Sequence, residues 1–393
     1  MLIMKQVWML SATQALCMSG SFLFFLLGGI IGSQLAPAPG LATLPVSLVI
    51  VGLAGSVLPA GMLIRRLGRR AAFVLSALLA GLGCTIAGLG IHTGNFWIFC
   101  TGALLLGANN AMVMRYRFAA VEYVTPVRAS KAIAIVMSGA FVAAWLGPEI
   151  AVRSADLVAG AHYAGSFFVG AGFYALAAIL LALTPVAAVA TDKDTRPPRP
   201  LLEIAAQADF RVAVLAALVS YAVMSFIMTA TPISMHVIDL HDEVATKRVI
   251  QGHLLAMYLP SLASGWIIAR FGIRPVIVAG TLLMASCVAI AAFLGHAVLH
   301  YAWALVLLGA GWNLLFIAGT TLLTTTYRSQ ERVQVQSLND FMVFGSQAIA
   351  SLMAGVALAT IGWQRLNLAT LPLLAAVLLS LALAACRGRV GPA

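Results

Sequence analysis

Charged residues are scarce in this chain of 393 residues. They make up 9% of the sequence, whereas apolar residues make up 62% and the mean hydropathy is +1.01. A soluble domain carries roughly 25% charged residues to cover its surface. The scarcity therefore excludes a soluble enzyme, a disordered chain and a nucleic-acid-binding protein, although the net charge is +11. The composition instead predicts an all-α integral membrane protein surrounded by the lipid bilayer.

Cysteine is also rare, and its spacing matches neither a disulfide framework nor a zinc site. None of the five cysteines forms a C-x-x-C pair, and all lie within or at the ends of apolar runs: Cys17, Cys84, Cys100, Cys287 and Cys386. The sequence also lacks a nucleophile elbow, a haem-ligand pair and a phosphate-binding loop. We therefore expect no enzymatic activity and no permanently bound cofactor.

Long apolar runs are abundant, and a bilayer-spanning helix needs about 20 mostly apolar residues. The chain divides into twelve such runs. Six lie near 7–32, 41–64, 71–91, 96–115, 131–152 and 164–187, and six near 211–236, 246–269, 274–295, 299–325, 336–360 and 365–386. The first run has no cleavage site, so we expect a retained helix rather than a signal peptide. The polar stretch between the two sets predicts an N-terminal bundle at 1–187, a cytoplasmic linker at 188–210 and a C-terminal bundle at 211–393.

The basic residues indicate how the chain is oriented, because cytoplasmic loops are enriched in lysine and arginine. If the N-terminus is cytoplasmic, four of the 23 basic residues face outside, namely Arg153, Lys247, Arg248 and Arg365, and 19 face the cytoplasm. Both termini of this multi-pass membrane protein are therefore predicted to be cytoplasmic. The charge of +11 describes this topology and does not indicate a nucleic-acid partner.

An internal repeat with an offset of 204 residues relates the two halves. Gly61, Arg66, Gly68 and Arg70 recur as Gly265, Arg270, Gly272 and Arg274. Such self-similarity indicates a duplicated architecture. Two parallel six-helix halves are typical of major facilitator transporters, so we expect twelve transmembrane helices in two pseudo-symmetric six-helix bundles.

The loop at 61–70 resembles the G-x-x-x-D-R-x-G-R-R signature of the major facilitator superfamily, and the resemblance covers essentially the whole chain. It implies a cytoplasmic gate built from Gly61, Arg65, Arg66, Gly68, Arg69, Arg70, Arg270 and Arg274. Arg65 stands where the family usually has aspartate, so the role of that aspartate is not carried over. The positive-inside rule alone would also account for these arginines.

Two runs of the second half contain soft metal ligands at helical spacing. Met224 and Met228 in one run, and His253 and Met257 in the next, are four residues apart and so share a helix face. Counting from the external ends places them about 10–18 Å deep. Thioether and imidazole groups suit Cu(I), and the positions 204 residues earlier hold no strong ligand. Methionine is common in apolar helices, so a role in the core is the alternative. Aromatic and hydrogen-bonding residues, as a sugar transporter needs, are not prominent at mid-span in this half.

These pairs resemble the M-x-x-x-M and H-x-x-x-M of the CcoA-like copper importers within the major facilitator superfamily. Thr229-Ala230-Thr231-Pro232 and Pro260-Ser261 are also similar to that group. The resemblance implies Cu(I) import by alternating access across the bacterial inner (cytoplasmic) membrane, with copper as the transported substrate supplied to cytochrome oxidase assembly. Related members that lack the pairs carry riboflavin or other solutes. We expect a monomer.

Further residues extend this prediction. Secondary metal ligands are expected among Cys17, Met18, Met235, His236 and His241. Asp340 and Glu149 are candidates for gating or ion coupling, although Asp340 could equally pair with a cytoplasmic arginine. Gly147-Pro148 partly resembles an exporter motif. Two alternatives therefore stay open: transport of a small organic solute, either uptake or efflux of a flat one such as a flavin or efflux of a drug, and a membrane-bound copper sensor or chaperone. The near-equal halves favour transport over sensing.

Overall fold

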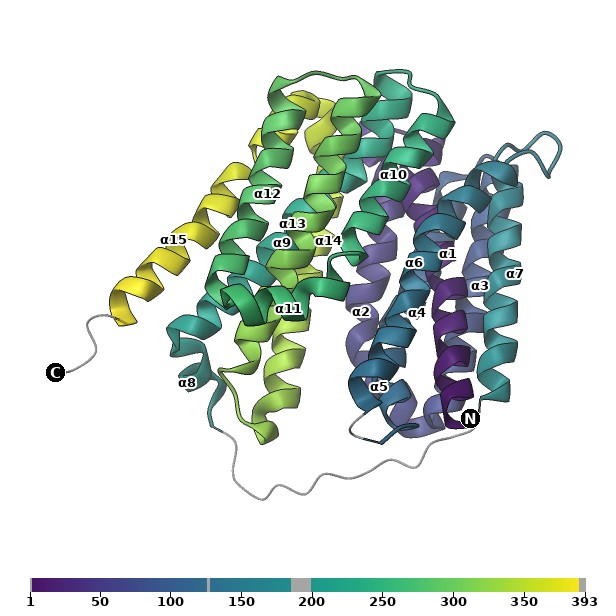
Figure 1. Ribbon diagram of the computed structural model, residues 1–393. Coiled ribbons are helices and arrows are strands. Elements are labelled where there is room, and N and C mark those ends of the chain that lie inside the picture. Colours follow the sequence, from purple (N-terminus) through teal and green to yellow (C-terminus); the bar gives the residue numbers. More distant parts are fainter. Residues whose placement is uncertain (1, 126–127, 185–198, 389–393) are drawn as a thin grey trace. The chain divides into compact units, whose positions relative to one another are not determined.

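The computed structural model describes residues 2–125, 128–184 and 199–388, and within them the chain is helical with short connections (Figure 1). The first half contains α1 (Leu2–Leu35), η1 (Pro39–Leu41), α2 (Leu44–Leu67), α3 (Arg69–His92), α4 (Phe96–Val113), α5 (Tyr116–Val121), α6 (Ala129–Arg153) and α7 (Ala164–Leu183). The second half contains α8 (Leu201–Ala206), α9 (Ala208–Pro232), the π-helical turn η3 (Ile233–Ile238), α10 (Glu243–Tyr258), α11 (Ser261–Phe271), α12 (Ile273–Phe293), α13 (Val298–Thr324), η4 (Ser329–Glu331), α14 (Arg332–Leu368) and α15 (Leu371–Gly388).

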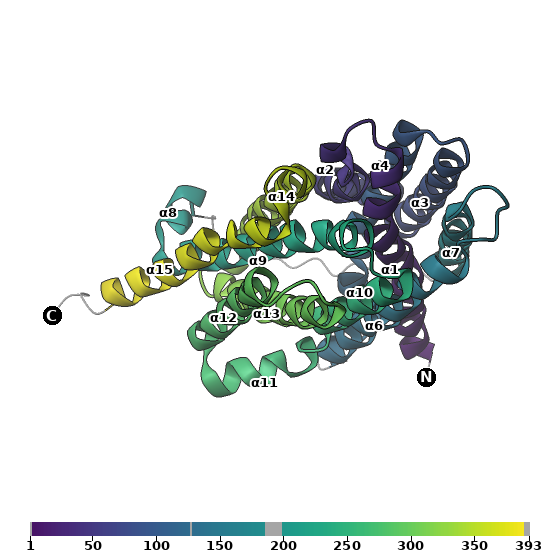
Figure 2. The same cartoon turned by 90° about the horizontal axis from the view of Figure 1, so that it is seen from above.

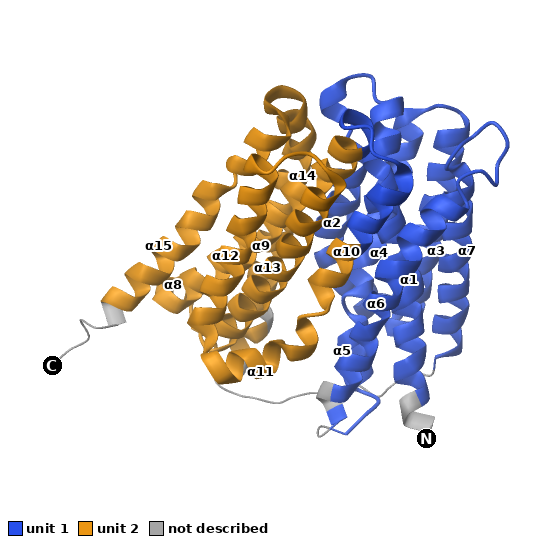
Figure 3. Cartoon of the chain, turned by 45° about the horizontal axis from the view of Figure 1, so that its top comes forward, with its two compact units in different colours: residues 1–191, 236–251 blue, residues 192–235, 252–393 orange. Residues whose placement is uncertain are grey.

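The helices form two compact units (Figure 3). Unit 1 comprises Met1–Thr191 and His236–Gln251, and unit 2 comprises Asp192–Met235 and Gly252–Ala393. The boundary therefore falls within η3 and within α10 as well as before α8. Residues 188–198 of the predicted linker lie outside the described residues, and α8 occupies part of the remainder.

The described helices account for twelve membrane spans. Nine long apolar segments each cross once, and the bent pair α10–α11 forms another span. One apolar segment, Gln334–Cys386, has 53 residues. As a single helix it would be about 80 Å long, more than twice the roughly 30 Å hydrocarbon core. It contains α14 and α15, and therefore supplies two spans.

Helix packing repeats from one unit to the other. In unit 1, α1 packs against α6, and α3 packs against α4 and α7. In unit 2, α9 packs against α14, and α12 packs against α13 and α15. The first span thus contacts the fifth in each unit, and the third contacts the fourth and sixth. Viewed along the helices, α9 lies between α13 and α14 (Figure 2). This is the pseudo-symmetry that the 204-residue repeat predicts.

The repeated glycines end helices at equivalent places. Gly68 joins α2 to α3 with φ of 78°, and Gly272 joins α11 to α12 with φ of 86°. Positive φ is costly for residues with a Cβ atom, and glycine adopts it without that cost. Each glycine lets the chain change direction within one residue, so the next helix begins at once, at Arg69 in unit 1 and at Ile273 in unit 2. The repeat in sequence is therefore a repeat in backbone geometry.

Candidate functional site

Five aromatic side chains from four helices meet in unit 2, and we call this group the aromatic layer. It consists of Tyr221 of α9, Tyr258 of α10, Trp312 and Phe316 of α13, and Phe344 of α14. The ring centroid of Tyr221 lies 5.1 Å from that of Trp312, 4.9 Å from that of Phe316 and 5.6 Å from that of Phe344, each pair edge to face. The rings of Trp312 and Phe316 are nearly parallel at 5.6 Å, and Tyr258 lies 6.3 Å from Trp312.

The aromatic layer lies at the middle of its helices. At 1.5 Å per residue, Trp312 is about 21 Å from the start of α13 and about 18 Å from its end. Tyr221 is about 20 Å from the start of α9 and about 17 Å from its end. Because each helix crosses the membrane once, both rings lie near the bilayer midplane. Trp312 and Phe344 are buried, whereas Tyr221, Tyr258 and Phe316 are half-buried.

Buried polar atoms without hydrogen-bond partners accompany the aromatic layer on the same helices. Within the described residues, the buried side-chain atoms of these helices that have no hydrogen-bond partner include Nε2 of His253, Nε1 of Trp312, Oδ1 of Asn313 and Oε1 of Gln347. Their residues are 0%, 5%, 2% and 7% exposed. An unsatisfied polar group buried in apolar surroundings costs several kcal/mol. Unsatisfied polar atoms inside a membrane span are typical of a site that receives a polar ligand.

The break between α10 and α11 lies beside the aromatic layer. The two helices are bent by 44° between Tyr258 and Ser261. Pro260 has no amide hydrogen to continue the helix, so backbone carbonyls at the bend need other donors. Nδ2 of Asn313 donates to the carbonyl of Met257 and to Oγ of Ser261, at 2.6 Å each. Asn313 therefore stabilises the broken helix and fixes it against α13.

His253 joins α10 to α13 one turn from this break. Its Nδ1 lies 2.7 Å from the carbonyl oxygen of Leu305. Since a carbonyl only accepts, Nδ1 carries the proton and Nε2 is left as an acceptor. The helices can approach closely because Gly309 has no side chain: a Cβ atom there would lie 2.7 Å from the carbonyl oxygen of His253.

The four residues predicted to bind metal all belong to unit 2. Met224 and Met228 lie on α9, His253 and Met257 lie on α10, and all are at most 8% exposed. Nδ1 of His253 is committed to a backbone carbonyl. Among the described residues no group of three or more histidine, cysteine, aspartate or glutamate side chains is arranged to hold a metal ion. The role of the four residues stays a prediction.

The predicted secondary ligands fall in unit 1 and at its boundary. Cys17 is buried, with its sulfur 4.0 Å from the hydroxyl of Tyr116, and Met18 is half-buried. Met235 is fully buried in η3. Nδ1 of His236 lies 2.9 Å from the carbonyl oxygen of His241, so this histidine bonds within its own turn. Their proposed part in metal capture is untested.

The arginines of the family motif take different partners. In unit 1, Arg69 forms an ion pair with Glu122, and Arg70 donates to the carbonyl of Ala182 in α7. Arg65 and Arg66 are exposed. A Cβ atom on Gly61 would lie 3.6 Å from the guanidinium of Arg115, which donates to the carbonyl of Val57 at 3.0 Å.

The second copy of the motif is more loosely held. In unit 2, Nη2 of Arg274 lies 3.1 Å from a carboxylate oxygen of Asp209, and both side chains are about half exposed. The guanidinium of Arg270 lies 6.0 Å from the ring of Phe271. An exposed ion pair contributes little to stability, so the contacts of this loop hold its helix ends less firmly than the Arg69–Glu122 pair holds those of unit 1.

The two acidic residues predicted to couple or gate have unequal surroundings. Glu149 of α6 accepts from Nζ of Lys247 at 2.9 Å and from Nε of Arg153 at 2.6 Å. The Glu149 and Lys247 side chains are 13% and 11% exposed, so their pair is largely buried. This pair joins α6 to the first turns of α10 within unit 1. Asp340 of α14 accepts from Nδ2 of Asn339 at 3.4 Å.

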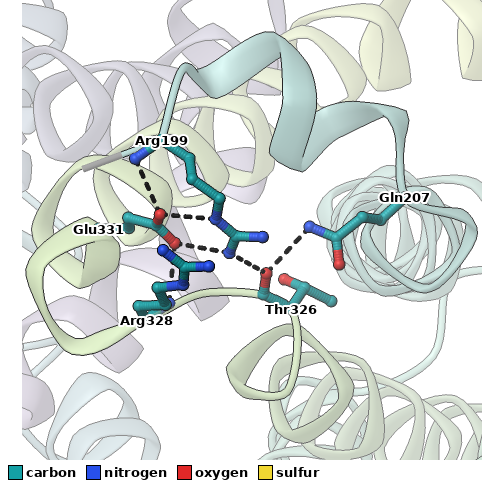
Figure 4. Close-up of polar contacts among 5 residues, drawn as sticks. All are labelled: Arg199, Gln207, Thr326, Arg328 and Glu331. Carbon is teal, nitrogen blue, oxygen red and sulfur yellow. Dashed lines mark hydrogen bonds and ion pairs between the residues drawn. The ribbon is translucent and has the colours of Figure 1, made fainter. Parts of the chain in front are cut away.

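A second polar cluster in unit 2 joins the chain before α9 to the turn between α13 and α14 (Figure 4). The backbone amide, Nε and Nη2 of Arg199 donate to the carboxylate of Glu331 at 2.7–2.9 Å, and the amide of Arg328 donates at 2.8 Å. Arg199 and Gln207 also donate to the carbonyl of Thr326. The Arg199 guanidinium holds the pKa of Glu331 well below its usual range.

The expectation that aromatic and hydrogen-bonding residues are sparse at mid-span in the second half is wrong. Tyr221, Trp312, Asn313, Phe344 and Gln347 are all there. They come from runs far apart in sequence, so no single window contains them. The signal within one run is Trp312-Asn313 followed by Phe316, an indole, an amide and a phenyl ring within about one turn of a 27-residue apolar helix.

Two six-helix units related by a repeat, with a broken helix and buried polar atoms at the midplane, define a secondary transporter. The fold agrees with solved transporters. The nucleoside transporter NupG matches with a TM-score of 0.75 at 14% identity, covering 97% of this chain and 99% of its own. A bacterial homologue of the lysosomal transporter Spinster, in an inward-facing and unoccupied conformation, matches with a TM-score of 0.75 at 15% identity, covering 97% and 96%.

The sequence places the chain within a family. The model of the Major Facilitator Superfamily matches residues 9–264, and the chain belongs to that superfamily. The riboflavin transporter RfnT of Brucella anthropi is 39% identical over 385 residues, 96% of this chain and 95% of its own. YdeG of Bacillus subtilis, an uncharacterized MFS-type transporter, is 28% identical and covers 87% of this chain and 83% of its own. The chain is thus a multi-pass transporter of the inner membrane.

The prediction of copper import for cytochrome oxidase assembly is wrong. A relative that is 39% identical over nearly the whole chain is a riboflavin transporter and not a CcoA-like copper importer. The physical reason is that methionine and histidine four residues apart also suit ordinary helix packing. Here His253 binds a helix carbonyl, and all three methionines are buried. Spacing along one helix cannot separate these two uses.

Proposed function

We propose that this protein carries riboflavin, or a flavin closely related to it, into the cell across the inner membrane. The observation that carries the proposal is the 39% identity to a riboflavin transporter over 96% of the chain. The match also covers 95% of that relative, so the similarity extends over both halves of the transporter. The mid-depth aromatic layer supports the same substrate, because aromatic side chains stack well on flat heteroaromatic rings.

The proposed mechanism is alternating access by the two predicted bundles, residues 1–187 and 211–393, joined by the linker at 188–210. We propose that the 61–70 loop contributes to the cytoplasmic gate. The ion pair between Arg69 and Glu122 and the bond from Arg70 to α7 support this role, because they fix the start of α3 against neighbouring helix ends within unit 1.

The residues first assigned to a metal take a different role in this proposal. Met224 lies about one turn along α9 from Tyr221, and Met257 lies next to Tyr258 of the aromatic layer. Thioethers make favourable contacts with aromatic rings. We infer that these methionines support the walls of the flavin site, and that His253 holds α10 against α13.

The test is uptake of radiolabelled riboflavin by a bacterial strain that neither makes riboflavin nor imports it. Expression of the protein should restore growth on low external riboflavin and produce saturable uptake above that of the empty vector. Unlabelled riboflavin in excess should abolish the signal. A correctly inserted protein that restores neither growth nor uptake would refute the proposal. Lower accumulation than in the vector control would instead indicate export.

A further inference from the structure

The aromatic layer and its neighbouring polar atoms differ from an ordinary apolar core. A core of leucine and alanine would satisfy the packing of α9, α13 and α14 without any polar atom. Here Trp312 brings a buried indole N–H, and Gln347 brings a buried amide oxygen, both without a partner among the described residues. Gln347 lies three residues after Phe344 on α14, so it lies on the same face about one turn away.

These two atoms are complementary in hydrogen bonding. The indole Nε1 can only donate, and the amide Oε1 can only accept. A ligand that satisfies both must therefore present an acceptor and an N–H or O–H donor. It must also bring a flat, polarisable surface if it is to lie against Tyr221, Phe316 and Trp312. A metal ion has neither feature, and a sugar has the polar groups without the flat ring.

We propose that the aromatic layer binds the flat ring system of the substrate, and that Trp312 and Gln347 hydrogen-bond the edge of that ring. The class of ligand is a fused heteroaromatic ring with an imide edge, where an N–H lies between two carbonyls. The isoalloxazine of riboflavin has this edge. The proposal rests on the proposed function and adds which unit of the protein, and which side chains, recognise the ring.

The broken helix keeps this arrangement in register. Asn313 follows Trp312 in α13 and is bonded to Met257 and Ser261 on both sides of the α10–α11 bend. Rotation of α13 would break those bonds, so the orientation of Trp312 depends on them. Asn313 is therefore a positioning residue, and the ring contacts are made by its neighbours.

The first experiment tests the ring site without any variant. Uptake of radiolabelled riboflavin into proteoliposomes is measured with lumiflavin or ribitol as competitor. Lumiflavin keeps the ring and lacks the ribityl chain, and ribitol is the chain without the ring. The proposal expects lumiflavin to compete and ribitol to have no effect at the same concentration. Competition by ribitol alone would overturn it.

The second experiment removes one ring. Phe316→Leu should raise the KM for riboflavin about tenfold, because loss of one stacked aromatic ring weakens base binding by that order. The matched control is Phe341→Leu on α14, whose ring is 65% exposed and lies outside the aromatic layer. It should transport as wild type. Equal KM values for the two variants would overturn the proposal.

The third experiment tests the imide edge. The wild type should prefer riboflavin over 3-methylriboflavin, which lacks the imide N–H, by about tenfold. Gln347→Leu should abolish that preference, and Gln364→Leu, at an exposed position of α14 beyond the kink at Gly362, should keep it. A merely structural role for Gln347 would lower uptake of both flavins equally, and that result would overturn the assignment.

A parallel pair of variants tests the indole donor. Trp312→Phe keeps an aromatic ring and removes the N–H, and Trp303→Phe makes the same change at a 57% exposed position of α13. The first should raise the KM about five- to tenfold, and the second should not. Failure of wild-type uptake would overturn the proposed function together with this inference, whereas wild-type uptake with unchanged Phe316, Gln347 and Trp312 variants would overturn the ring site alone.

Discussion

Substitution of Gly309 by alanine is expected to separate α13 from α10 at the broken span. A Cβ atom at this position would lie 2.7 Å from the carbonyl oxygen of His253 and 3.0 Å from the amide nitrogen of Met257. Ordinary contact begins at about 3.4 Å, so the helices must move apart by about 0.7 Å. Both obstructing atoms belong to the backbone of α10, so rotation of a side chain cannot relieve the clash.

The expected loss of stability follows from two costs. Inserting a methyl group into a well-packed interface costs about 1–3 kcal/mol. A separation of 0.7 Å would also stretch the hydrogen bond from His253 to Leu305, now 2.7 Å, and losing it costs about 1 kcal/mol. We therefore expect Gly309→Ala to lower the free energy of unfolding by about 2–4 kcal/mol.

The assay is thermal unfolding of the detergent-purified protein, followed by riboflavin uptake in proteoliposomes. Gly345→Ala is the matched control, because a Cβ atom there meets nothing within 4 Å and alanine favours a helix over glycine. The control should unfold at or above the wild-type temperature. Gly309→Ala should unfold several degrees lower and take up less riboflavin. Equal unfolding temperatures for Gly309→Ala and wild type would refute the close approach of these helices.

Three further outcomes are expected. Glu331→Gln should lower the unfolding temperature at neutral pH. The pKa of Glu331 is lowered in the folded protein, so its ionised carboxylate stabilises the fold above about pH 4.5. The difference from wild type should shrink as the pH falls toward the folded pKa, and a pH-independent difference would contradict the role of the charge. Lys247→Met should destabilise the protein more than Arg153→Met, because both remove a partner of Glu149 but Arg153 is 75% exposed; equal melting curves would contradict this. Stripping copper with a chelator should leave riboflavin uptake unchanged, and restoration of lost uptake by added copper would show a metal requirement.

Much of the fold could be predicted because the membrane imposes it locally. An apolar run of about 20 residues can satisfy its backbone in the bilayer only by forming a helix or a barrel strand. The positions of the spans therefore followed from composition and length. The glycines of the repeat were equally informative, since the φ of Gly68 and of Gly272 depends on the residue itself and its immediate neighbours.

The broken span contains a local signal for its bend, the proline at position 260. The eighth apolar run predicts one helix near 246–269, whereas the structure divides it at Pro260 into α10 and α11. Proline inside a helix removes a donor and clashes with the preceding turn, which favours a bend. The bend is stabilised by the hydrogen bond from Asn313, more than 50 residues later in the chain. It therefore depends on a tertiary contact as well as on the proline.

The sequence predicts the wrong substrate, copper, because its supposed ligands are close together in sequence, whereas the members of the aromatic layer are far apart. Met224, Met228, His253 and Met257 stood out through spacing within single helices. Tyr221, Trp312 and Gln347 come from three different spans, and only their packing places two of these rings 5.1 Å apart. A helical period reports which residues share a face, and it does not report what that face contacts.

The sequence by itself determined the class of molecule, the number of spans, the duplication and the orientation, because each depends on hydrophobicity, charge or one residue's backbone preference. Tertiary structure alone decided that His253 is bonded to a helix carbonyl, that Asn313 holds a broken span, and that aromatic rings from four helices meet at mid-depth. Those features depend on contacts between segments far apart in the chain. The energy of such contacts comes from close packing and from hydrogen bonds in a medium without water, and no single segment of the sequence contains both partners.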